Sequence, residues 1–192
     1  MVGDDRTDGQ ARFAYLAHCL LNANSKVGEG AICAGIYAPL VECLRSEGWT
    51  IRQLPCPELV FTGLRRFWAV REQYDTAAYR AHCARLVQAV VGQMEADLRG
   101  GGEVVVIGVD GSPSMGVQVT ASSPDWGGRP EISGDDDYPV APGSGLFVEA
   151  LLAELSVRGL GGVRSVGIGQ DLPGYDEAEE LARIGRVLEA PP

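Results

Sequence analysis

The residues that could do chemistry in this chain gather in three short stretches, which are "HCLLN" at 18–22, "PCPEL" at 55–59 and "DGSPSMG" at 110–116. The first two stretches each carry a thiol, Cys19 and Cys56, and the second adds the carboxylate of Glu58. The third supplies the hydroxyls of Ser112 and Ser114. Thiols bind metals or react as thiolates, and a positioned carboxylate transfers protons. The three stretches therefore predict a site for thiol, metal or acid–base chemistry.

Each stretch follows a segment whose apolar pattern predicts a strand. Strands are expected at 12–18, 49–54, 103–109 and 163–169. Amphipathic patterns predict helices at about 31–47, 75–99, 143–159 and 175–189, with Asp75 as the cap of the second. Strands that alternate with helices predict an α/β fold, with a single doubly wound, mostly parallel, Rossmann-like sheet and helices on both faces.

The order of these elements places the three chemical stretches at one edge of the sheet. Ligands of open parallel sheets bind beyond the carboxyl ends of the strands. Because neighbouring parallel strands bring those ends together, Cys19, Cys56 and Met115 are expected to converge there. The segment 55–68 contains two prolines and is expected to be irregular, and 110–143 is expected to be a long functional loop.

Composition limits the class of protein. The chain has 192 residues, is 45% hydrophobic, and is expected to form one α/β domain over 11–192 after a flexible arm at 1–10. Its net charge of −10 argues against nucleic acid as a partner. Neither a signal peptide nor an apolar run of membrane-spanning length is visible, so a cytoplasmic protein without a membrane partner is expected. Five cysteines argue against a disulfide framework.

The three motifs, together with "PGSGLFVEALLAEL" at 142–155, resemble the DUF523 family of thiouracil desulfurases and related desulfidases. The resemblance extends from about Tyr15 to Leu155. It implies that three cysteines hold a 4Fe–4S cluster whose fourth iron accepts the substrate's sulfur. The first two ligands match Cys19 and Cys56, and the position of the third is Met115. The family motifs also imply that Glu58 and Ser112 handle protons or position the substrate.

Met115 departs from the family pattern, because a thioether is neutral and cannot replace the charge of a cluster thiolate. Three outcomes remain open. Cys33 could substitute as the third ligand, or a cluster could form on two thiolates with a water or carboxylate. Otherwise no cluster forms, and Cys19 or Cys56 could act as a nucleophile whose pKa is lowered by nearby helix N-termini.

Other candidates have a structural alternative as well as a functional one. His18 could be a proton donor or a structural histidine, and Asn22 could orient a substrate or cap a turn. Ser114 and Met115 are expected to contact a substrate, and Arg65, with its neighbour Arg66, could receive an anionic one. On the long loop, the three aspartates of "GDDDY" at 134–138 are expected to be solvated, although they could also bind a divalent cation. Trp126 and Tyr138 on the same loop could cover a pocket.

Three functions follow from these observations. The first is a desulfidase-like enzyme acting on a thiocarbonyl-type small molecule in a pocket beyond the strand ends. The second is a cluster-free enzyme on the same scaffold that uses cysteine, glutamate or histidine for acid–base or covalent chemistry. The third is a non-catalytic protein that binds a small molecule. The sequence does not determine the oligomeric state.

Overall fold

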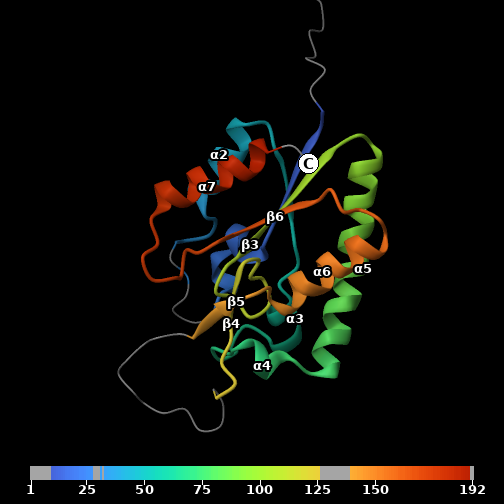
Figure 1. Cartoon of the computed structure of the whole chain (residues 1–192). Helices are drawn as coiled ribbons and strands as arrows, with labels where there is room; N and C mark the ends of the chain where they lie inside the picture. Colours follow the sequence, from blue (N-terminus) through green and yellow to red (C-terminus); the bar gives the residue numbers. More distant parts are fainter. Residues whose placement is uncertain (1–9, 28–30, 32, 126–138, 191–192) are drawn as a thin grey trace, which may run out of the picture.

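The computed structural model describes residues 10–27, 31, 33–125 and 139–190, and a four-stranded sheet lies at its centre (Figure 1). The strands are β1 (Arg12–Leu16), β2 (Thr50–Gln53), β3 (Glu103–Val109) and β6 (Arg164–Ile168), in the spatial order β2-β1-β3-β6. Every neighbouring pair in this sheet is parallel. The expectation of an α/β fold with a parallel, Rossmann-like sheet is confirmed.

The two faces of the sheet are covered by different helices (Figure 1). On one face, α2 (Ala38–Ser46) packs against β2 and α7 (Glu177–Glu189) packs against β6. On the other, α5 (Ala77–Arg99) packs against β3 and against α6 (Leu146–Val157). Because both faces are covered, β3 is buried continuously from Val104 to Val109 and consists almost entirely of apolar residues.

The strand order reverses between β1 and β3. After β1 the chain crosses through α2 to β2 on one side, and it then returns through α5 to β3 on the other side of β1. The connections beyond the carboxyl ends of β1 and β3 therefore leave in opposite directions. In open α/β sheets this point is where ligands bind.

A short helix, α3 (Pro57–Thr62), occupies part of the segment that was expected to be irregular. Pro57 is its first residue, where a missing N–H costs nothing because a helix leaves its first N–H groups unpaired. The proline therefore starts a helix here instead of breaking one. Its start places Cys56 at the cap position and Glu58 in the first turn.

Two helix boundaries also differ from expectation. The first long helix was expected from about residue 31, but α2 begins at Ala38 and leaves Ile36 exposed. Thr76 caps α5 in place of Asp75, because the Thr76 side chain accepts a hydrogen bond from the Tyr79 amide at 3.2 Å. Asp75 instead pairs with Arg80.

The expected long loop contains two short strands, β4 (Val119–Ala121) and β5 (Val140–Pro142), which pair antiparallel as a separate sheet. The shorter helices are α1 (His18–Leu21), η1 (Ala23–Ser25) and α4 (Arg71–Tyr74). The arm at 1–9, Trp126 and the segment "GDDDY" lie outside the described residues.

Within the ranges given above, no helix combines the length and the apolar character that crossing a bilayer requires.

Candidate functional site

The site lies at the carboxyl ends of the first three strands of the sheet. Cys19 is in α1, three residues beyond the end of β1, and Cys56 is the cap residue of α3, three residues beyond the end of β2. Met115 lies in the tight turn after β3 and is buried. The ionic states of Cys19, Cys56 and Glu58 influence one another, so these groups lie within electrostatic range.

Glu58 is the most heavily bonded group of the site. Its side chain is 8% exposed, and its two carboxylate oxygens accept hydrogen bonds from three side chains. The Ser114 hydroxyl donates to Oε1 at 2.5 Å and the Ser112 hydroxyl donates to the same oxygen at 3.4 Å. On the other oxygen, Arg66 Nε donates to Oε2 at 3.1 Å. Glu58 is thus held between the turn after β3 and the segment after α3.

The Ser112 hydroxyl lies where two backbone amides and the Glu58 carboxylate meet. Its Oγ accepts a hydrogen bond from the Met115 amide at 3.0 Å and another from the Ser114 amide at 3.3 Å. The two N–H donors stabilise negative charge on the Ser112 oxygen. The proton of the same hydroxyl points to the Glu58 carboxylate, which accepts it in a hydrogen bond. Ser112 is partly exposed, whereas Ser114 is fully buried. Ser112 is therefore the hydroxyl that a ligand can reach, and Ser114 orients the carboxylate.

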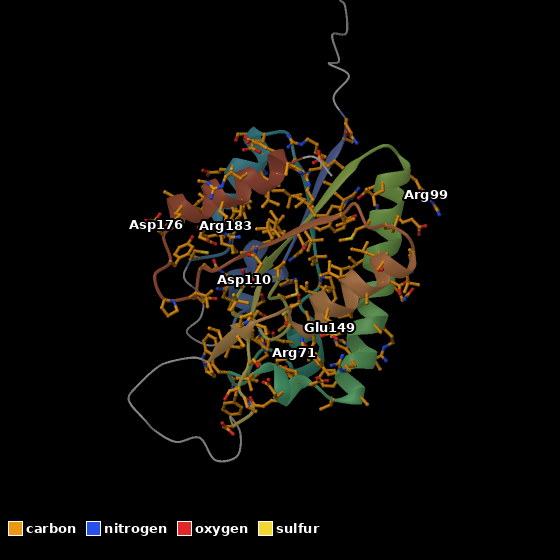
Figure 2. The ribbon with its side chains drawn as sticks, in the orientation of Figure 1. Arg71, Arg99, Asp110, Glu149, Asp176 and Arg183 are labelled. Carbon is orange, nitrogen blue, oxygen red and sulfur yellow. The ribbon has the colours of Figure 1, made fainter. Side chains whose placement is uncertain are left out.

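The turn that carries these serines is shaped by Asp110, which lies near the middle of the molecule just beyond β3 (Figure 2). One oxygen of this buried carboxylate, Oδ1, accepts hydrogen bonds from the amides of Val117, Gln118 and Val119, at 2.8, 2.9 and 3.3 Å. At Gly116 an added Cβ would lie 2.3 Å from the Val119 carbonyl oxygen, so only glycine fits. The turn is fixed by its backbone and by Asp110.

Arg66 is a buried cation whose side chain is 6% exposed. Besides its bond to Glu58, its Nη2 donates to the Ser25 carbonyl at 2.8 Å, which joins the segments after α3 and after α1. Its Nη1 is buried and has no hydrogen-bond partner in the described part of the chain. A buried donor left without an acceptor costs about 1–3 kcal/mol, so this atom lowers the stability of the fold.

Both thiols are held in the protonated form. Burial raises the pKa of Cys19 to about 12, against the opposing effect of the nearby Lys26 cation. The pKa of Cys56 is raised by burial and by the Glu58 charge, although the Leu59 amide and Arg66 oppose the shift. The expectation that helix N-termini lower the pKa of these thiols was therefore wrong, because desolvation of the thiolate outweighs the favourable dipoles.

Lys26 and Asp171 form a pair that closes one side of the site. Lys26 follows η1, its side chain is 8% exposed, and its Nζ bonds both carboxylate oxygens of Asp171, at 2.9 and 2.7 Å. Asp171 follows β6, so this pair links the connections that leave β1 and β6. Both charges act on the pKa of Cys19, which Lys26 lowers and Asp171 raises. Sequence reasoning missed this pair, and the only signal available was the position of Asp171 shortly after the fourth strand.

The expected site residues divide into two groups. Glu58, Ser112 and Ser114 contact one another, and Cys19 and Cys56 lie close to Glu58.

His18 and Asn22 instead contact each other, at 3.3 Å, and His18 also bonds Gln53 at 2.9 Å. Burial lowers the pKa of His18. Arg65 is exposed, while its neighbour Arg66 holds Glu58. The resemblance singled out Glu58, but its partner could not be chosen from two adjacent arginines.

The sulfur atoms near the strand ends determine whether the cluster that the resemblance implies could be held there. Cys19 and Cys56 supply two thiol sulfurs, and Met115 supplies a neutral thioether from the third strand end. The thiol of Cys33 donates to the Ile36 carbonyl at 3.3 Å. Cluster iron requires anionic thiolates, so these residues do not fit a cluster with three cysteine ligands.

The other two cysteines lie on helices that cover the sheet. Cys83 is buried in α5, where the Glu58 charge also influences its pKa. Cys43, on α2, is only partly buried and contacts Glu47.

Comparisons with known proteins give one family and one relative. Residues 35–129 match the family described as "Putative 2-thiouracil desulfurase", a range that contains Cys56, Glu58, Arg66 and the turn after β3. An uncharacterized protein of Methanocaldococcus jannaschii is 31% identical over 106 residues, which cover 55% of this chain and 68% of that protein. No solved structure matches this chain.

Proposed function

This chain belongs to the family described as "Putative 2-thiouracil desulfurase", and we propose that it removes sulfur from a thiocarbonyl-type small molecule at the carboxyl ends of β1, β2 and β3. One observation carries the proposal, which is the Glu58 carboxylate held by Ser112, Ser114 and Arg66 beside two thiols. A proton acceptor next to sulfur groups is what exchange of sulfur for oxygen requires.

The reaction is a hydrolysis. Water adds to the thiocarbonyl carbon, the carbon–sulfur bond breaks, and a carbonyl compound and hydrogen sulfide are the products. Atoms and electrons balance without an oxidant or a reductant. Ser112 orients the attacking water and passes its proton to Glu58, to which its hydroxyl is bonded. Arg66 and Ser114 keep the carboxylate in place during this transfer.

The thiols act on the sulfur side of the substrate. Because their pKa values are raised, Cys19 and Cys56 remain S–H groups at neutral pH and serve as weak donors to the departing sulfur. Met115 adds a polarisable apolar sulfur. Lys26 and Arg66 supply positive charge when hydrosulfide forms. No step is assigned to an iron–sulfur cluster, because the third donor is a thioether.

The test uses 2-thiouracil and measures sulfide and uracil together. The wild-type protein is expected to release the two products in equal amounts. Glu58→Gln should lower the rate by a factor on the order of 100, which is typical for the loss of a general base. Glu42→Gln, which changes an exposed carboxylate on α2, is the matched control and should keep the rate.

Two results would contradict the proposal. One is an unchanged rate in a folded Glu58→Gln protein. The other is the absence of sulfide from 2-thiouracil, 4-thiouracil and thiobenzamide alike. Thermal stabilisation by these compounds without any turnover would instead indicate a binding protein.

A further inference from the structure

A cavity of about 410 Å³ lies on the α5 side of the same strand ends, and the proposed function does not use it. It is bounded by the chain just after β2, by the start of α1 and by one face of α5. Small-molecule sites in proteins range from about 300 to 1,000 Å³, so the volume suits a single small ring.

The surfaces of the cavity are mainly apolar. Pro55, backed by the fully buried Leu54, forms the side that follows β2, and Leu86 and Val90 face it from successive turns of α5. Side chains four apart on a helix lie on one face, so Leu86 and Val90 present a continuous surface. Two apolar walls of this kind accommodate a planar ring.

One cation borders this apolar space. Arg85 lines the cavity, and within the described ranges its guanidinium makes no hydrogen bond or ion pair. A guanidinium binds a carboxylate through two parallel hydrogen bonds. The guanidinium of Arg85, at the border of the cavity, is therefore placed to bind a ligand that carries a carboxylate.

His18 and Gln53 supply the polar edge of the cavity. The Gln53 side chain is held by its hydrogen bond to His18 Nδ1 at 2.9 Å, and His18 is held in turn by Asn22. A side-chain amide offers two donors and one acceptor oxygen, so this single bond leaves Gln53 with capacity for a ligand. An amide fixed in this way matches the alternating N–H and C=O groups of a heterocyclic ring.

We propose that this cavity binds a small planar molecule with one carboxylate, with the ring between Pro55 and Leu86 and the carboxylate on Arg85. The proposal does not depend on the proposed function. The site nevertheless adjoins the thiols, because His18 precedes Cys19 and Pro55 precedes Cys56 in the chain. A ligand held there would lie against the backbone that carries both.

The experiment compares two probes that differ by one carboxylate, uracil-6-carboxylate and uracil, by titration calorimetry on the full chain. Neither probe contains sulfur, so the result is independent of desulfurisation. The wild-type protein is expected to bind the carboxylate probe about tenfold more tightly. Arg85→Gln should bind the two probes equally. Ala89→Trp, which fills the cavity from an exposed helical position, should bind neither.

Arg45→Gln is the matched control, because Arg45 is an exposed arginine on α2, on the opposite face of the sheet (Figure 1). It should retain the preference for the carboxylate probe. Equal binding of both probes by the wild-type protein, or an unchanged preference in Arg85→Gln, would overturn the proposal. Unchanged binding by a folded Ala89→Trp protein would do the same.

Discussion

The Ser114 hydroxyl donates a hydrogen bond of 2.5 Å to the Glu58 carboxylate, between residues that lie 56 positions apart in the chain. Both groups are buried, one in the turn after β3 and the other in the first turn of α3. This contact joins two of the three chemical stretches directly. Ser112 bonds the same oxygen at 3.4 Å, which is a longer and weaker interaction.

Replacing each serine should separate stability from activity. Ser114→Ala removes the shorter bond and is expected to lower the free energy of unfolding by about 1–3 kcal/mol, because a buried carboxylate loses a donor. Ser112→Ala should change stability less and reduce sulfide release more, because Ser112 is the partly exposed member of the pair. Urea denaturation and sulfide assays measure the two quantities. Equal effects of both variants on both quantities would refute this division of roles.

Met115→Cys should restore a donor set that fits a cluster. After anaerobic reconstitution with iron and sulfide, this variant is expected to hold about four irons per chain and to gain visible absorption, while the wild-type protein holds fewer. Met94→Cys, which adds a thiol in the core on α5, is the control and should not gain iron. Equal iron content in wild type and Met115→Cys would show that the third thiolate does not limit binding.

Thiol labelling should follow both the ionisation and the exposure of each cysteine. With its pKa raised to about 12, Cys19 is a thiolate in only about one molecule in ten thousand at pH 8. Cys19 is partly exposed, like Cys33 and Cys43, but its raised pKa is expected to make it react more slowly with iodoacetamide than Cys33. The buried Cys56 and Cys83 should stay unmodified in the native state. Peptide mass spectrometry at successive times measures the order in which the cysteines are modified. Early modification of Cys19 would show that burial does not control its ionisation.

Asp97 should contribute to acid stability. Burial opposes its ionisation, but hydrogen bonds from Arg52 and Tyr15 outweigh this effect and lower the pKa of the carboxyl. A lowered pKa stabilises the fold above the unfolded value near 3.8, and this stability is lost as the pH falls below it. Asp97→Asn should therefore reduce the free energy of unfolding at pH 7 and flatten its decline below pH 4.

The control for that prediction is Glu42→Gln, which removes an exposed carboxylate. It should leave the pH dependence of unfolding unchanged. If the curves of Asp97→Asn and wild type run parallel between pH 6 and pH 2, the ion pair does not contribute through ionisation.

The sequence predicted the central elements well and the boundaries of partly exposed ones poorly. β3 occupies 103–109 as expected, because a central strand covered on both faces is marked by a continuous apolar run. The start of α2 was wrong because Ile36 fits the helical period but lies in an exposed bend outside the helix. α3 was missed because the same proline can break a helix or begin one, and local sequence does not distinguish the two.

The convergence of Cys19, Cys56 and the turn after β3 was predictable, since parallel strands bring their carboxyl ends together. The partners of Glu58 were not, because Arg66 and Arg65 are equivalent in type and only the path after α3 turns one of them inward. The direction of the thiol pKa shifts was also beyond the sequence. It depends on how completely neighbouring elements exclude water, which no local pattern reports.

One oxygen of Asp110 accepts hydrogen bonds from three amides of the turn after β3. The path of the turn depends on that carboxylate and on Gly116, whereas the Met115 side chain packs into the hydrophobic core and makes no hydrogen bond within the described residues. The backbone path of the turn and the chemistry of the side chain at position 115 are therefore determined by different residues. A substitution at position 115 can change the sulfur atom at the site while the backbone of the turn keeps its path. A change at this one position could therefore give the same fold a different reaction.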